Sequence, residues 1–301
     1  MKEAVIVSTA RTGMGKSFRG ALNDTEAPAM GGHAVKAAVE RAGIDPASVE
    51  DVIMGAAAQQ GTQSYNLGRL CSVAAGLPDT TAGMTMDRQC SSGLMSIAWA
   101  AKSIMCDEMD VAVAGGLESI SLVQTKHKNS YRNVSQTVTD IDPTAYIPMI
   151  ETAEIVSERY GISREAQDEY ALQSQMRVAA AQEAGLFNDE IVPFATRMAV
   201  FNKETKETSY QDVVLDRDEC NRPSTTLESL QGLAPVWKDG QWVKEGKFIT
   251  AGNASQLSDG ASASVLMEAK RAEQLGLAPL GAYRGLAVAG CKADEMGIGP
   301  V

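Results

Sequence analysis

Histidine is scarce in this chain, which has only His33 and His127 among its 301 residues. That scarcity nearly excludes a site that needs several imidazoles. Positive charge is also in deficit: 27 Lys and Arg stand against 38 Asp and Glu, which gives a formal net charge of −11. This balance argues against nucleic acid or an anionic membrane as the main partner. No apolar run is long enough to span a bilayer, and the N-terminus lacks the pattern of a signal peptide, so we expect a cytoplasmic protein without a membrane partner.

The cysteines are five in number, an odd count, and no two of them have CxxC spacing. We therefore expect free thiols in a reducing compartment, with neither a disulfide framework nor a metal site. The five are Cys71, Cys90, Cys106, Cys220 and Cys291.

The first 125 residues or so alternate β-rich runs with helical stretches, which predicts a layered α/β domain. From about residue 124 to 241 the pattern changes to polar segments and two helices, which indicates a long insertion on the α/β core. The second of these helices is expected to begin after the N-cap Ser163 and to end at Gly185. After the insertion the α/β pattern resumes. Strands are expected at 4–9, 52–55, 81–86, 111–114, 248–250, 264–267 and 282–289, and helices at 28–42, 66–75, 94–105, 150–160 and 163–184.

Cys90 is the best candidate for chemistry, because it lies between an expected strand and the first turn of an amphipathic helix. Unpaired amide groups and the positive end of the helix dipole stabilise a thiolate at such a place. Residues 91–93 are small, so a substrate carbonyl can approach closely, and Arg88 adds positive potential. These features favour a nucleophile that takes an acyl group. The alternative is a small buried residue at a helix start.

A catalytic thiolate usually needs a base within hydrogen-bonding reach, and neither histidine is a convincing one. His33 lies in an expected amphipathic helix, where it is a packed or a surface residue, and His127 lies in a solvated basic stretch. Glycine-rich turns at 115–119 and 250–261 follow strands, and they are either tight turns or places where a ligand approaches the backbone.

Several sequence blocks, in order along nearly the whole chain, resemble the thiolase family. They are 4–13 (AVIVSTARTG), 88–94 (RQCSSGL), 114–119 (AGGLES), 152–154 (TAE), 160–165 (YGISRE) with Asp168, 222–228 (RPSTTLE), and 250–255 (TAGNAS) with 259–261 (DGA).

The resemblance implies a thiolase-type layered α/β fold with two similar βαβαβ-type halves, the first of which is interrupted by a loop domain. It places the N-terminal domain at 1–123 and 247–279, and the inserted loop domain, which binds CoA and supports tetramers, at 124–246. Residues 280–301 are then the start of a C-terminal half that is only begun.

The resemblance also implies reversible Claisen chemistry in fatty acid metabolism. Cys90 takes an acyl group from a CoA thioester, and in the reverse direction a 3-oxoacyl-CoA is cleaved, with oxyanion stabilisation at each step. The implied CoA contacts are Met149, Arg222, Ala251 and Ser255. Acyl-CoA and CoA are then substrates, no separate cofactor is needed, and a homo-oligomer, dimer or tetramer, is expected.

Departures from the family pattern qualify this expectation. In the family a GHP motif supplies the activating histidine and a CxGGG motif supplies a second cysteine, and residues 1–301 contain neither. We therefore expect that this chain lacks a C-terminal portion and that it turns over substrate weakly or not at all. Residues 148–150 (PMI) stand where acetoacetyl-forming members often carry His-Met-Gly, which favours the broad-chain 3-oxoacyl type. The alternatives are a non-catalytic CoA-binding or assembly protein on the same scaffold and, less well matched, a ketosynthase-type condensing enzyme.

Overall fold

The computed structural model describes residues 2–301, which divide into two compact units. The first unit comprises residues 2–128, Phe187–Cys220 and Leu257–Leu286, and the second comprises Asn129–Leu186, Asn221–Gln256 and Ala287–Val301. This division differs from the expected domains, because residues 187–220 group with the sheet and not with the rest of the insertion.

A mixed β-sheet forms the centre of the first unit. Its strands run in the order β4-β3-β5-β8-β1-β9, with the short β2 paired to β8. β3 is parallel to β4 and β5, whereas β8 is antiparallel to both β5 and β1. The central strands are apolar runs because helices cover both faces of the sheet. The strands are β1 (Ala4–Arg11), β2 (Gly15–Lys16), β3 (Asp51–Gly55), β4 (Ala82–Met86), β5 (Val111–Glu118), β8 (Ser258–Glu268) and β9 (Gly281–Ala282).

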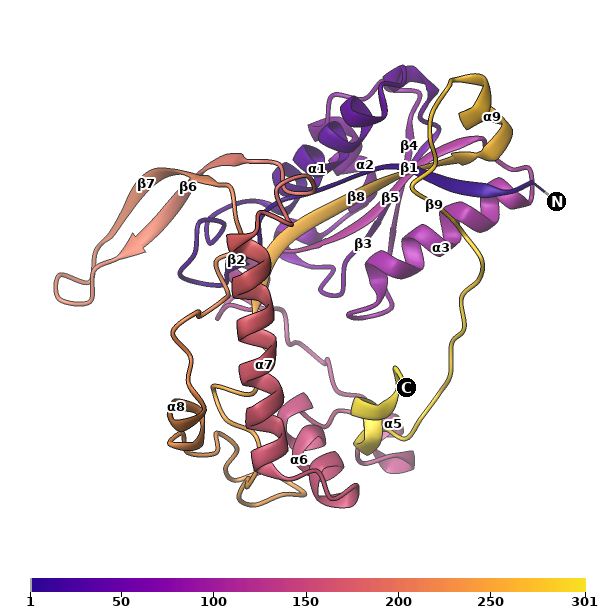
Figure 1. The fold of residues 1–301 in the computed structure, drawn as a ribbon. Helices are drawn as coiled ribbons and strands as arrows, with labels where there is room; N and C mark the ends of the chain where they lie inside the picture. The colour runs from indigo at the N-terminus through magenta and orange to yellow at the C-terminus, as the bar shows by residue number, and fades with distance from the viewer. Residues whose placement is uncertain (1) are drawn as a thin grey trace. The chain divides into compact units, whose positions relative to one another are not determined.

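The helices of this unit lie on both sides of the sheet (Figure 1). α1 (Ala27–Ala42) and α2 (Leu67–Ala74) cover one face, and α3 (Ser92–Met105) covers the other. On the α3 side, small residues pack closely against the strands, and Ile104 is fully buried there. The short helices α4 (Ile120–Val123) and α9 (Ala269–Gln274) complete the unit. The layered α/β fold is thus confirmed.

A β-hairpin of β6 (Phe194–Phe201) and β7 (Thr208–Leu215) forms a separate two-stranded sheet in the first unit. The Asn23 side chain holds β6 by donating to the Ala199 carbonyl at 2.8 Å and accepting from its amide at 2.9 Å. The sequence pattern did not predict these strands, because β6 shows no clear alternation of apolar and polar residues and β7 begins with a polar, exposed run.

The second unit is mainly helical. α7 begins after Ser163, whose hydroxyl accepts from the Ala166 amide, so the predicted N-cap is confirmed. Gly185 follows the end of α7 with a φ of +69°, also as predicted. The helices are α5 (Gln136–Ile141), α6 (Met149–Arg159), α7 (Arg164–Glu183), α8 (Leu227–Gln231) and the 3₁₀ segment η3 (Ala293–Ile298).

Two expected strands are wrong. At 248–250, the Phe248 and Ile249 amides donate to the Glu154 carboxylate and the Thr250 amide donates to the Asn253 side chain, so these groups are not available to a strand ladder. At 282–289, pairing with β1 stops after β9, because the chain leaves the first unit at Leu286.

His33 packs inside the first unit and is not placed as a catalytic base. Its ring lies 4.6 Å from the Phe194 ring, and its buried Nε2 has no hydrogen-bond partner within residues 2–301. Burial lowers its pKa from 6.5, against the opposing effect of the Val192 backbone. A group whose pKa is lower in the folded chain binds fewer protons when folded, so it makes stability rise with pH in this range.

Lowering the pH from 7.5 to 5 should therefore reduce the free energy of unfolding less in His33→Gln than in the wild type. The measurement is urea unfolding of both proteins at both pH values. Burial raises the pKa values of Asp51 and Asp259, but both carboxyls titrate in the two proteins alike and cancel in the comparison. An unchanged pH slope in the variant would contradict the prediction.

Candidate active site

The parallel strands β3, β4 and β5 end together at one edge of the sheet, beside the start of α3. The carboxyl ends of adjacent parallel strands meet at the same edge, which is where α/β proteins usually place their sites. The Ala56 amide, just after β3, donates to the Met86 carbonyl at the end of β4 at 3.0 Å. Cys90 comes four residues after β4 and therefore lies near this edge.

Two glycines let the first turn of α3 rest directly on the strand ends. A Cβ added to Gly55 would lie 2.2 Å from the carbonyl carbon of Ser92, and one added to Gly116 would lie 2.9 Å from the Cα of Gly93. Only a residue without a side chain allows backbone to approach backbone this closely.

The turn that carries Cys90 is held by its own side chains. Gln89 has a φ of +48°, a left-handed conformation that is uncommon for residues other than glycine. The Asp87 carboxylate accepts from the Gln89 amide at 2.6 Å, and the Ser92 hydroxyl donates to the Gln89 carbonyl at 2.5 Å and accepts from the Arg88 amide at 2.8 Å. Cys90 itself is exposed, so its sulfur is open to a reagent or substrate.

Free amide groups lie at the start of α3. The Ser91 and Ser92 amides donate to the carbonyls of Arg88 and Gln89, whereas the Gly93 and Leu94 amides have no acceptor among residues 2–301. Unpaired N–H groups at a helix start carry partial positive charge and stabilise a neighbouring anion. The place suits a thiolate or an oxyanion.

Glu118 holds the loop that follows β3. Its carboxylate accepts from the Ala57 and Ala58 amides at 2.9 and 3.3 Å and from the Gln63 side chain at 2.6 Å. Gln63 is fully buried and accepts in turn from the Ser119 amide at 2.6 Å. The sequence pattern at 114–119 did not predict this role of Glu118, for which the available signal is an acidic residue at the end of a buried strand.

The other four sequence-predicted site residues lie in the second unit, whereas Cys90 lies in the first. Ala251 and Ser255 belong to one turn, Arg222 lies in a loop before α8, and Met149 is the first residue of α6. All four are exposed, as residues that touch a ligand need to be.

The turn at 250–255 is compact and internally bonded. The Thr250 amide donates to Asn253 Oδ1 at 2.8 Å, the Thr250 hydroxyl accepts from the Gly252 amide at 3.2 Å, and the Ala254 amide donates to the Thr250 carbonyl at 3.0 Å. Thr250 is fully buried, so the turn presents Ala251 and Ser255 outward from a fixed base.

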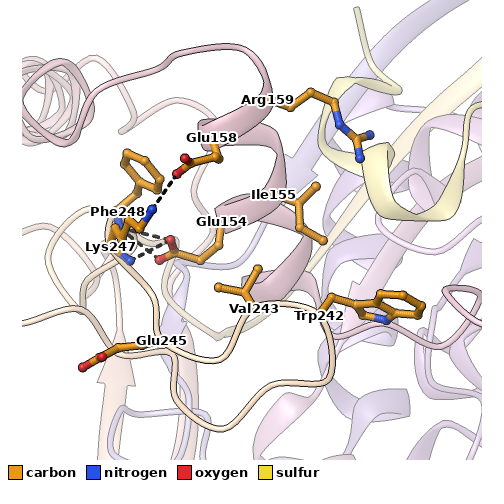
Figure 2. A pocket seen from close by; sticks show the side chains of 9 residues that line it. All are labelled: Glu154, Ile155, Glu158, Arg159, Trp242, Val243, Glu245, Lys247 and Phe248. Carbon is orange, nitrogen blue, oxygen red and sulfur yellow. Dashed lines mark hydrogen bonds and ion pairs between the residues drawn. The ribbon is translucent and has the colours of Figure 1, made fainter.

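A hollow of about 440 Å³ lies in the second unit between α6 and the loop after α8 (Figure 2). Its charged groups are largely paired: the buried Glu154 accepts from three backbone amides, Glu158 pairs with Lys247 at 3.1 Å, and Arg159 pairs with η3. None of the five sequence-predicted site residues lines it. The lining residues are Glu154, Ile155, Glu158, Arg159, Trp242, Val243, Glu245, Lys247 and Phe248.

Within residues 2–301, no helix has the length and apolar character needed to cross a membrane. The same part of the chain contains no group of three or more His, Cys, Asp or Glu placed to hold a metal ion.

The fold and the site define a layered α/β protein with an exposed thiol at the start of a helix that packs on the sheet. Residues 4–270 match the family described as the N-terminal domain of thiolases. The chain is 42% identical over its whole length to the 3-ketoacyl-CoA thiolase of Bacillus subtilis and 39% identical to the acetyl-CoA acetyltransferase of Cupriavidus necator, and it covers 75% of each. A solved human mitochondrial 3-ketoacyl-CoA thiolase in complex with CoA superposes with a TM-score of 0.81 at 33% identity, over 99% of this chain and 73% of that one. The chain belongs to the thiolase family, whose members are acyltransferases.

Proposed function

We propose that Cys90 accepts an acyl group from a coenzyme A thioester, as the first half of a reversible Claisen condensation and thiolysis of 3-oxoacyl-CoA. The observation that carries the proposal is an exposed thiol in the turn that leads into α3, a helix whose Gly93 and Leu94 amides are unpaired among residues 2–301. Similarity to 3-ketoacyl-CoA thiolases, including one solved with CoA, supports the choice of substrate.

In the proposed step the Cys90 thiolate attacks the thioester carbonyl and a carbon–sulfur bond forms. The carbonyl oxygen becomes an oxyanion, which amides at the helix start stabilise. The bond to CoA sulfur then breaks, CoA leaves as a thiolate that takes up a proton, and the acyl group stays on Cys90. In the second half, a base removes a proton from the methyl group of another acetyl-CoA, and the resulting carbanion attacks the acyl carbon. The bond from that carbon to the Cys90 sulfur breaks, so 3-oxoacyl-CoA is released and Cys90 returns to the thiolate.

CoA would bind through Met149, Arg222, Ala251 and Ser255. A guanidinium suits the phosphates of CoA, and a turn of small residues leaves room for the narrow pantetheine chain. The proline at 148 and the isoleucine at 150 support a broad-chain substrate over acetoacetyl-CoA alone.

Residues 1–301 should acylate Cys90 once but turn over weakly. His33 is packed against Phe194 and His127 is exposed in a basic stretch, and a general base typically supplies about 10²–10⁴-fold in rate. The alternative, a non-catalytic CoA-binding or assembly protein, would bind CoA without forming an acyl-cysteine.

Intact-mass spectrometry of the chain after incubation with acetyl-CoA tests the proposal. We expect one added acetyl group, which peptide mapping assigns to Cys90, and which disappears when free CoA is added in excess. CoA binding without any acetyl-cysteine would favour the non-catalytic alternative. Assembly into a homo-oligomer and a cytoplasmic location stay predictions.

A further inference from the structure

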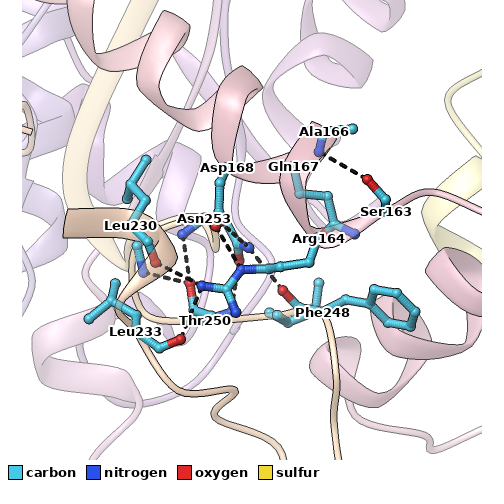
Figure 3. A network of polar contacts seen from close by, with 12 residues as sticks. Ser163, Arg164, Ala166, Gln167, Asp168, Leu230, Leu233, Phe248, Thr250 and Asn253 are labelled. Carbon is cyan, nitrogen blue, oxygen red and sulfur yellow. Dashed lines mark hydrogen bonds and ion pairs between the residues drawn. The ribbon is translucent and has the colours of Figure 1, made fainter. Parts of the chain in front are cut away.

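A buried ion pair lies in the first turns of α7 (Figure 3). The Arg164 guanidinium donates through Nε to Asp168 Oδ2 at 2.8 Å, and the Asp168 side chain is fully buried. A buried carboxylate is costly unless it is paired and hydrogen-bonded, so the surroundings of this one have to be well matched.

The arginine end of the pair binds the segment around α8. Arg164 Nη2 donates to the carbonyls of Leu230 and Leu233 at 2.7 and 3.0 Å. These two carbonyls lie at the end of the segment 222–233, which begins with the CoA-binding candidate Arg222.

The carboxylate end binds the turn at 250–255. The second oxygen of Asp168, Oδ1, accepts from Asn253 Nδ2 at 3.0 Å. Asn253 also donates to the Phe248 carbonyl at 2.9 Å and accepts from the Thr250 amide at 2.8 Å, so its side chain determines the shape of the turn.

The two segments also touch each other directly. A Cβ added to Gly252 would lie 2.6 Å from a terminal carbon of both Leu230 and Leu233. The turn therefore cannot come closer to Leu230 and Leu233, and the ion pair bridges the same two segments through hydrogen bonds to each.

We propose that Arg164 and Asp168 form a positioning pair, which sets the spacing between the segments 222–233 and 250–255 and thereby the affinity for coenzyme A. The inference rests on the proposed function, since it takes those two segments as the CoA-binding surface. Neither residue is assigned a contact with substrate. Their effect passes through main-chain groups of the segments, so it should appear in substrate binding and not in the reactivity of Cys90.

Single-turnover acetyl transfer from acetyl-CoA to Cys90, followed by intact mass over a range of acetyl-CoA concentrations, separates these effects. For Asp168→Asn we expect the half-saturating concentration to rise about tenfold or more, while the rate at saturation changes less than about twofold. The matched control is Glu169→Gln, an equal change of charge at the next, exposed position of α7, and it should behave as the wild type.

Gly252→Ala provides a second variant that leaves both charges in place. The added methyl pushes the turn away from Leu230 and Leu233, so it should also raise the half-saturating concentration while the saturated rate is kept. This variant decides the question if Asp168→Asn does not fold.

The inference is overturned if the folded variants keep the wild-type half-saturating concentration of acetyl-CoA. It is also overturned if that concentration rises and the rate at saturation falls by the same factor. A wild-type chain that does not label would instead contradict the proposed function, and calorimetric binding of CoA then decides the inference. Equal CoA affinity in the wild type and Asp168→Asn overturns it, a weaker affinity in the variant supports it, and a wild type that binds no CoA overturns both proposals.

Discussion

Replacing Cys90 with alanine should abolish acetyl transfer from acetyl-CoA, with a fall in rate of about 10³-fold or more, because no other group can form the covalent intermediate. The measurement is the time course of acetyl incorporation by intact mass. The change is small in volume and lies at an exposed position, so the variant should fold as the wild type does.

Cys106 provides a matched control, because it caps the opposite end of the same helix. Both thiols are exposed, yet Cys90 lies at the positive end of the α3 dipole and Cys106 at the negative end. Cys106→Ala should therefore leave acetyl transfer unchanged, and iodoacetamide should alkylate Cys90 faster than Cys106. Cys71 should not react in the folded chain, since burial raises the pKa of its thiol to about 12. Acetyl found on Cys106 as fast as on Cys90 would contradict the assignment.

The central fold could be predicted from the sequence because local signals and burial agree there. The stripe of apolar residues from 94 to 105 predicts a helix packed on one side, and α3 buries Ala98, Ala101 and Ile104 on the sheet as expected. Leu94, at the start of the stripe, is 61% exposed instead of buried. The N-cap Ser163 and the terminating Gly185 likewise needed only local chemistry.

The β6–β7 hairpin and the segment 248–250 show where such signals fail. The hairpin puts a cross-strand pair of Arg197 and Asp212 on an exposed face, and the turn and the first half of β7 are polar, so the segment after Phe201 looks like a loop. The run Phe-Ile-Thr at 248–250 has high strand propensity, but its first two amides donate to the Glu154 carboxylate of α6 and the third donates to the Asn253 side chain. Strand propensity depends strongly on tertiary context, and here that context decides the outcome.

The same limit applies to the candidate site. The position of Cys90 before a helix could be predicted, because strand, turn and helix are adjacent in the sequence. The hydrogen bonds that hold the surrounding loops could not be predicted, because their partners are far apart in the sequence. Glu118 bonds to Gln63, 55 positions away, and Asp168 bonds to Asn253, 85 positions away. Contacts at that separation leave no periodicity in the chain, although both acidic residues lie in blocks that resemble the thiolases.

Gly55→Ala should strongly destabilise the first unit, because the new methyl would meet the backbone of Ser92 and Gly93 within about 2.5 Å. Backbone atoms at a helix start cannot rotate away as a side chain can, so α3 has to shift off the edge of the sheet. We expect a loss of about 3 kcal/mol in the free energy of unfolding, measured in urea, or failure to fold.

Gly285→Ala is the matched control, since an added Cβ there has no atom within 4 Å and the backbone is not left-handed. It should change the free energy of unfolding by less than about 1 kcal/mol. A displaced α3 also disturbs the turn that joins Cys90 to the helix start, so any folded Gly55→Ala protein should lose the faster alkylation of Cys90 over Cys106. If that difference persists while stability falls, the reactivity of the thiol does not depend on how the helix is seated, and the electrostatic explanation for Cys90 is wrong.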